Sequence, residues 1–233
     1  MLDSNWDLDH DAPIGPQLHR ILRERIVRND LISGSKISEP EIAKFYAISR
    51  QPVREAFIKL SEEGLISIRP KRSTVVRKID PVAVFDARFV REAIEADVVK
   101  LLAEASDPMV VKELRRQIEA QKSATGGNPD LFIQLDERFH RTLAESADKA
   151  NAWHFVEGLK SQMDRVRFLS LSQFPKITLV EQHIDIVDGI ESGNVDRSET
   201  SIRKHLNEIL KDFPEIQAAN PEFFEPVSEE TLK

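Results

Sequence analysis

Residues 49–66, SRQPVREAFIKLSEEGLI, carry the pattern that decides the fold of the first third of the chain. Ser49 is a suitable N-cap, Pro52 fits the first turn of a helix and Gly64 fits its end. Apolar residues recur between them at helical spacing and predict one buried face. These residues are Val53, Ala56, Phe57 and Leu60.

The flanking segments extend this helix into a small domain. Residues 16–28 and 38–46 also show helical spacing, and Ser38 with Glu41 matches a capping box. After Gly64, LISIRPKRSTVVRKI alternates apolar and polar residues around RPKR, which predicts a two-stranded ribbon with a basic tip. Helix, helix, turn, helix and ribbon is the layout of a winged helix-turn-helix, which we assign to residues 14–78.

The helix that begins at Ser49 is the candidate recognition helix. Arg50 and Arg54 lie four apart near its N-terminal end, where arginine side chains can reach guanine edges in the major groove. Gln51 could reach a base edge or a phosphate, and Lys71 and Arg72 at the ribbon tip could reach the backbone or the minor groove. The alternative is a solvated helix with ordinary surface arginines.

The charge distribution agrees with two domains that have different partners. Residues 14–78 contain 14 Lys and Arg against 7 Asp and Glu, a balance of +7 in a chain of net charge −7, so the remainder carries −14. The absence of cysteine excludes disulfides, thiolate metal sites and cysteine nucleophiles. No apolar run is long enough to span a membrane, and the acidic N-terminus does not resemble a signal peptide, so a cytoplasmic protein is expected.

The rest of the chain is predicted to be helical. Short connections imply a mainly α protein in which an antiparallel six-helix bundle over residues 79–213 follows the N-terminal domain, with a C-terminal tail over 214–233. The expected helices cover 82–105, 107–124, 130–147, 151–171, 176–191 and 195–212.

Three histidines and one aspartate are expected to point into this bundle. Asp136 and His140 lie four apart and leave the same face of their helix. His183 and His205 each fall on the apolar face of a later helix. A single inward histidine is more often a hydrogen-bonded core residue, but nitrogen and oxygen ligands on facing helices indicate a divalent metal site. A buried polar cluster without metal remains the alternative.

The N-terminal segment resembles the DNA-binding domain of GntR-type bacterial transcription regulators. SRQPVREAFIKLSEEGL matches the pattern S-R-x-P-V-R-E-A-L-x-x-L-x-x-E-G-L almost throughout, which implies that Arg50 and Arg54 read DNA. Three positions depart from the family: Pro40 stands where an arginine often contacts DNA, Ala47 replaces a turn glycine, and Ser73 replaces the usual wing glycine.

VREAIEADVVKLLAEA and LDERFHRTLAE resemble the FCD effector-binding domain of the FadR-like branch, over about residues 82–212. The resemblance implies that Asp136, His140, His183 and His205 hold a divalent metal. Zinc is the first expectation, and nickel or manganese are alternatives because imidazole and carboxylate ligands do not discriminate sharply between them.

A ligand for such a site would be anionic, because the metal would leave coordination positions open for a carboxylate. Arg88 and Arg91 in the first bundle helix, and Arg165 with Arg167 in the fourth, could supply positive charge. Arg91 matches a family position near the effector, so the expected set is Arg91, Arg88 and Arg165. For each arginine, an ion pair within its own helix, such as Arg91 with Glu95, is the alternative.

These features predict a homodimeric repressor that binds double-stranded operator DNA and responds to a small carboxylate metabolite bound at a metal. A direct metal sensor is one alternative. A metal-dependent hydrolase is another, but no HExxH-like arrangement, Ser-His-Asp order, phosphate loop or dinucleotide motif supports an enzyme.

Overall fold

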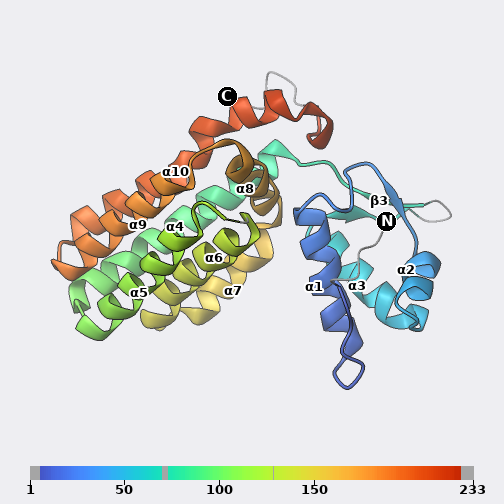
Figure 1. Ribbon diagram of the computed structural model, residues 1–233, viewed down its shortest axis with the longest axis horizontal. Helices are drawn as coiled ribbons and strands as arrows, with labels where there is room; N and C mark the ends of the chain where they lie inside the picture. Colours follow the sequence, from blue (N-terminus) through green and yellow to red (C-terminus); the bar gives the residue numbers. More distant parts are fainter. Residues whose placement is uncertain (1–5, 70–72, 128, 227–233) are drawn as a thin grey trace. The chain divides into compact units, whose positions relative to one another are not determined.

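The computed structural model describes residues 6–69, 73–127 and 129–226, and these residues form a mainly helical protein (Figure 1). The chain divides into two compact units. The first comprises the chain up to Pro81 together with a segment that begins at Asn220, and the second is Val82–Ala219.

The first unit has the predicted helix-turn-helix with a small antiparallel sheet. Its elements are α1 (Ile14–Val27), β1 (Lys36–Ile37), α2 (Glu39–Phe45), α3 (Arg50–Glu62), β2 (Ile66–Ser67), β3 (Thr74–Val76) and the short 3-10 helix η1 (Pro221–Phe223).

Local sequence explains where these helices begin and end. Ser38 caps α2 by accepting a hydrogen bond from the backbone N–H of Glu41. Ser49 occupies the N-cap position of α3 but makes no capping hydrogen bond through its side chain. Gly64 follows α3 with φ of 70°, a left-handed conformation that glycine adopts without steric cost. The apolar face predicted for α3 is buried as expected.

The sheet has three strands rather than the predicted two-stranded ribbon. Its order is β1-β3-β2, with Lys36 opposite Val75 and Ile66 opposite Val76. β1 is only two residues long, too short for an alternating pattern to be visible in sequence. It pairs because Gly34, with φ of 81°, turns the chain back so that its N–H reaches the Val76 carbonyl at 2.8 Å.

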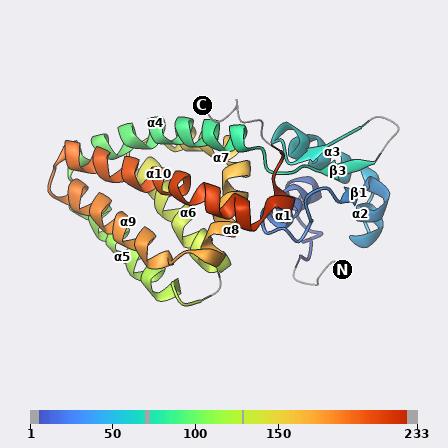
Figure 2. The same ribbon diagram turned by 90° about the horizontal axis from the view of Figure 1, so that it is seen from above.

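The second unit consists of helices that lie side by side in Figures 1 and 2, within which α9 contacts α5 and α10. The helices are α4 (Pro81–Ala105), α5 (Pro108–Ala124), α6 (Pro129–Ser146), α7 (Ala150–Leu159), α8 (Ser161–Gln173), α9 (Lys176–Glu191) and α10 (Val195–Ala219). Among the described residues, no helix combines the length and the apolar character that a membrane crossing requires.

The expected six-helix bundle therefore has a seventh helix, because the segment 151–171 divides into α7 and α8 at Lys160. Gly158, which lowers helix propensity, immediately precedes the division. The Lys160 ammonium is buried, 2.7 Å from a carboxylate oxygen of Glu137 and 2.9 Å from one of Asp164. Apolar periodicity continues across this bend, so the sequence pattern did not show it.

The last bundle helix is longer than expected. α10 continues through Pro214 to Ala219, because Phe213 and Ile216 on either side of the proline are buried and their packing offsets the lost backbone hydrogen bond. The chain that follows forms η1 and pairs with the first unit: the Ile79 N–H donates to the Phe223 carbonyl at 2.7 Å. Residues 220–226 of the expected tail are thus ordered against the N-terminal unit.

Candidate metal centre and recognition helix

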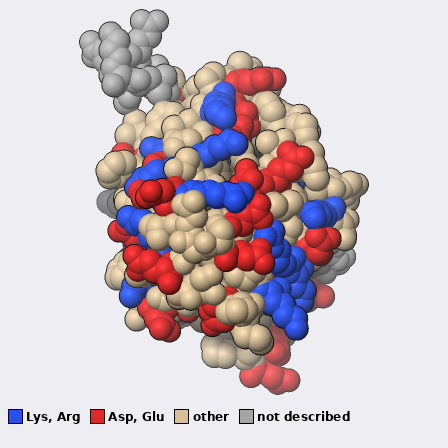
Figure 3. Space-filling view, turned by 90° about the vertical axis from the view of Figure 1, so that its left-hand side faces the viewer, with Lys and Arg blue, Asp and Glu red and all other residues tan. Residues whose placement is uncertain are grey.

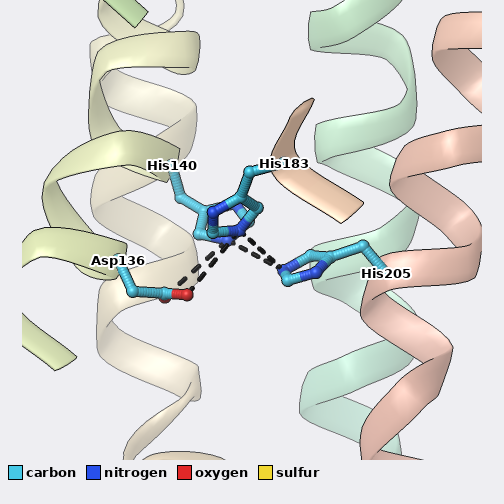
Figure 4. A group of neighbouring side chains, drawn as sticks. All are labelled: Asp136, His140, His183 and His205. Carbon is cyan, nitrogen blue, oxygen red and sulfur yellow. Dashed lines mark hydrogen bonds and ion pairs between the residues drawn. The ribbon is translucent and has the colours of Figure 1, made fainter. Parts of the chain in front are cut away.

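Asp136, His140, His183 and His205 come together in the interior of the helical unit (Figure 4). α6 contributes the first two, α9 the third and α10 the fourth. One ligand atom from each residue lies within 4.8 Å of the others, and all four side chains are buried. The Nε2 atom of His205 is 3.1 Å from that of His140 and 3.3 Å from that of His183. The sequence therefore identified four side chains that do meet.

The opposite nitrogen of each imidazole is held by a side-chain oxygen. Nδ1 of His140 lies 2.5 Å from a carboxylate oxygen of Glu95. Nδ1 of His183 is 2.7 Å from Oε1 of Gln121, and Nδ1 of His205 is 3.0 Å from Oε1 of Gln182.

The two glutamine amides are themselves oriented by their second hydrogen bonds. Gln121 donates its Nε2 to the carbonyl of Leu135 at 3.2 Å, and Gln182 donates its Nε2 to Glu208 at 2.9 Å. Both partners are acceptors, so each Oε1 must face its imidazole and accept a hydrogen bond from Nδ1–H. With each Nδ1 held by an oxygen acceptor, the Nε2 atoms of the three rings face one another, an arrangement suited to a cation between them.

Burial and local charge shift the pKa values of His183, His205 and Asp136. Burial lowers the pKa of His183 to about 3, although Asp136 acts in the opposite direction. Burial, with the neighbouring His183 and His140, also lowers the pKa of His205 well below its usual range. Burial alone would raise the pKa of Asp136, but Arg167 and the histidines outweigh it and hold that pKa well below its usual range. Neutral imidazoles beside an ionised carboxylate are ready to coordinate a cation.

The residues present therefore fit a divalent metal. Oδ1 of Asp136 is buried without a hydrogen-bond partner among the described residues, and lies 3.7 Å from Nε2 of His183. Oδ2 is 2.5 Å from the guanidinium of Arg167. Three nitrogen ligands and one carboxylate oxygen suit zinc and the other borderline divalent ions, and the set does not distinguish among them.

A cavity of about 50 Å³ adjoins the cluster. Leucine, isoleucine and methionine side chains form its apolar wall, and its polar wall comprises Arg91, Arg167, Ser170, His205, Glu208 and Asp212. At about 10–15 Å³ for each water, this space holds a few water molecules or a group as small as a carboxylate. A neighbouring cavity of about 90 Å³ shares Glu208 and Asp212 and reaches Phe174.

The three arginines expected to bind an effector occupy different surroundings. Arg91 lines the cavity and also forms the ion pair with Glu95 that the sequence suggested as its alternative. Arg88 is not among the residues that line either cavity, and contacts Glu92 and Asn207. Arg165 is fully buried outside both cavity walls, and burial lowers its pKa to about 10.

Several residues around the cluster were not identified from sequence. Arg167 was noted beside Arg165, but only the structure shows that it reaches Asp136 and the cavity. Gln121 had a detectable signal, since it is a polar residue on the buried stripe of α5. Gln182 and Glu208 had no such signal, because they lie 26 residues apart in sequence and on different helices.

The candidate recognition helix α3 exposes the predicted side chains. Arg50, Gln51 and Arg54 are exposed, whereas the predicted apolar face of the helix is buried. The guanidinium of Arg54 lies 3.4 Å from carboxylate oxygens of Glu39, and Gln51 donates to Glu55 at 2.9 Å. These exposed contacts are weak enough to exchange for DNA. Lys71 and Arg72 lie outside the described residues.

In the view of Figure 3, Lys and Arg side chains lie among Asp and Glu side chains over the described residues, and several of the basic side chains adjoin one another.

A helix-turn-helix with a small sheet, followed by a separate helical unit that contains the His/Asp cluster, is the layout of a DNA-binding regulator. Residues 16–76 match the family model described as bacterial regulatory proteins, gntR family, and residues 86–208 match the FCD domain. The chain belongs to the GntR family of transcription regulators, in its FadR-like group with a C-terminal FCD domain, and this is not a family of enzymes.

Individual relatives agree with this assignment. The chain is 37% identical over 219 residues to the HTH-type transcriptional repressor RspR of Escherichia coli strain K12. The matched region covers 93% of this chain and 96% of that protein. It is 28% identical to a probable D-xylose utilization operon transcriptional repressor of Paenarthrobacter nicotinovorans, over 83% of this chain and 85% of that protein. The E. coli McbR/YncC structure has the same fold, with a TM-score of 0.73 at 15% identity, over 89% of this chain and 99% of that one.

Proposed function

We propose that this protein is a repressor whose operator binding is controlled by a small organic acid bound beside a divalent metal in the FCD domain. The observation that carries the proposal is the convergence of three Nε2 atoms and Asp136, together with a cavity that His205 lines beside Arg91 and Arg167. A metal supplies a Lewis-acidic site for a carboxylate, and two guanidinium groups add complementary charge. Zinc is the expected metal.

The DNA-binding part of the proposal assigns direct base contacts to Arg50 and Arg54, with Gln51 at a base edge or phosphate. Lys71 and Arg72 are proposed to contact the DNA backbone or minor groove. A homodimer would place two winged domains on the two halves of a near-palindromic operator. Since the target is chromosomal DNA, the protein would act in the cytoplasm.

The acid must favour one of two arrangements of the dimer to have an effect. A ligand shifts the equilibrium between DNA-binding and non-binding states only by the difference between its affinities for them. Arg91, which already forms an ion pair with Glu95, is suited to this role because a ligand carboxylate would compete for the same guanidinium. Arg88 and Arg165 would act on the ligand only indirectly, since neither lines the cavity.

A direct metal sensor is the main alternative. It requires the ion to exchange readily with solvent, whereas His140, His183 and Asp136 are fully buried. This burial favours a resident ion that serves as part of the ligand pocket.

The test has two stages. Duplexes selected by the protein from a random library identify the operator, and a panel of small mono- and dicarboxylates is then titrated into the complex with metal-loaded protein. The proposal expects one class of acids to change the operator Kd at a fixed metal concentration. A Kd that responds only to free metal, across the panel, would establish the sensor instead.

A further inference from the structure

One of the three imidazoles is held differently from the other two. His140 is fixed by the buried carboxylate of Glu95. His183 is fixed by Gln121, whose NH₂ group donates to a backbone carbonyl. His205 is fixed by Gln182, whose NH₂ group donates to the side-chain carboxylate of Glu208. Of these anchoring groups, Glu208 alone lines the cavity.

These contacts form a relay from the cavity wall to a metal ligand. Glu208 lies one turn after His205 on α10, and Gln182 reaches both residues from α9. Gln182 is 5% exposed, whereas the Glu208 side chain is 21% exposed and also accepts from Lys211 at 2.9 Å. The inner part of the relay is thus buried and the outer end is accessible to a molecule in the cavity.

We propose that Glu208 is a positioning residue for the metal: by accepting from Gln182, it fixes the amide so that Oε1 faces His205, and thereby sets the imidazole tautomer that can coordinate. This inference rests on the proposed metal site. A molecule bound in the cavity would then affect the metal through Glu208, without coordinating the metal itself.

The physical reason is that the carboxamide of Gln182 has an acceptor oxygen on one side and a donor NH₂ group on the other. Without an acceptor at position 208, the Gln182 side chain can rotate by 180° and present its NH₂ group to Nδ1 of His205. Nδ1 would then act as acceptor and the proton would move to Nε2, the atom that faces the cluster. A protonated Nε2 cannot bind a metal.

The test compares metal affinity among full-length variants by competition with a zinc chelator of known affinity. Outer-shell partners of metal ligands typically contribute 10–100-fold in metal affinity, and we expect Glu208→Ala to weaken zinc binding by about 10-fold or more. Glu208→Gln retains an acceptor oxygen and is expected to stay within about 3-fold of wild type. Glu215→Ala, which removes an exposed carboxylate from the same helix, is the matched control and should leave the affinity unchanged.

A double-mutant cycle separates the relay from a general effect on folding. If Glu208 acts through Gln182, the double variant Gln182→Ala with Glu208→Ala binds zinc no more weakly than Gln182→Ala alone. Thermal melts of the metal-free variants report folding independently of metal.

The outcomes distinguish this inference from the proposed function. Wild-type protein that binds no zinc would overturn the metal site itself. Wild type that binds zinc, with Glu208→Ala equally tight, would overturn the relay and leave the metal site intact. Equal weakening in Glu208→Ala and Glu208→Gln would also overturn it, because that result would trace the effect to charge rather than to the accepted hydrogen bond.

Discussion

Nε2 of His140 lies 3.1 Å from Nε2 of His205, and the Nδ1 atom of each ring is hydrogen-bonded to an oxygen acceptor on the far side. In the tautomer with its proton on Nδ1, each ring offers Nε2 as the nitrogen that can coordinate a metal. A divalent ion among these Nε2 atoms would be held by both rings, and the first two predictions test this proposal.

Replacing one ligand should remove the metal. We expect His140→Ala to weaken zinc binding by more than about 100-fold, beyond the range usual for outer-shell partners, because it deletes a coordinating nitrogen. Metal content of the purified protein, measured by mass spectrometry, should fall from about one ion per chain to nearly none. His154→Ala is the control, since that side chain is 85% exposed, and it should retain the ion. An equal metal content in all three proteins would contradict the assignment of His140.

Removing the metal should also destabilise the fold. A ligand present at 1,000 times its Kd stabilises the state that binds it by about 4 kcal/mol. For a protein of this size, each kcal/mol shifts the Tm by roughly 2–4 °C, so chelation should lower the Tm by about 8–16 °C. Readdition of zinc should restore the Tm. A Tm that is insensitive to chelator in wild type, and equal to that of His140→Ala, would indicate a buried polar cluster that needs no ion.

The sequence predicted the convergence of these four side chains better than it predicted their surroundings. Asp136 and His140 are related by helical periodicity, and the apolar stripes around His183 and His205 show which way each residue faces. Gln182 and Glu208 meet only because α9 packs on α10, and no pattern within either helix encodes that contact. Arg165 and Arg167 illustrate the same limit, since a two-residue step on one helix decides whether a guanidinium reaches Asp136.

In the fold as well, the features that the sequence predicted depend on neighbouring residues, and those it did not predict depend on residues distant in sequence. Ala47 was recognised as standing in place of a turn glycine, and its φ of 52° shows that the backbone does adopt the left-handed conformation there. The strand β1 and the bend at Lys160 were not predicted, because each depends on partners distant in sequence: β3 for the strand, and Glu137 for the buried ammonium.

The recognition helix gives the third prediction. Each bidentate contact between an arginine and guanine contributes about 1–3 kcal/mol of discrimination, so Arg50→Ala and Arg54→Ala should each weaken operator binding by roughly 10–100-fold and relax the sequence preference. Fluorescence anisotropy on the selected operator, and on a scrambled duplex, measures both effects. Lys59→Ala is the control: Lys59 is exposed in the last turn of the same helix, away from the end that enters the groove, and should have little effect. Operator binding that survives both arginine substitutions together would exclude α3 as the reading element.

The fourth prediction concerns the contact between α9 and α10 that brings His183 and His205 together. A Cβ at Gly189 would lie 2.5 Å from Oγ and 2.9 Å from the backbone nitrogen of Ser198, so Gly189→Ala must push the two helices apart. Overpacking of this kind typically costs about 1–3 kcal/mol, and urea unfolding should show a lower midpoint at an unchanged slope.

Gly158→Ala is the matched control for that substitution. Apart from its chain neighbours and the backbone of its own helix, no described atom lies within 4 Å of a Cβ at Gly158. The alanine should therefore leave the packing intact and stabilise the helix by up to about 0.5–1 kcal/mol. Because His183 lies on α9 and His205 on α10, Gly189→Ala should also weaken zinc binding, whereas Gly158→Ala should not. Loss of stability in Gly189→Ala with unaltered zinc affinity would show that the spacing of the two helices at Gly189 is independent of the spacing at the cluster.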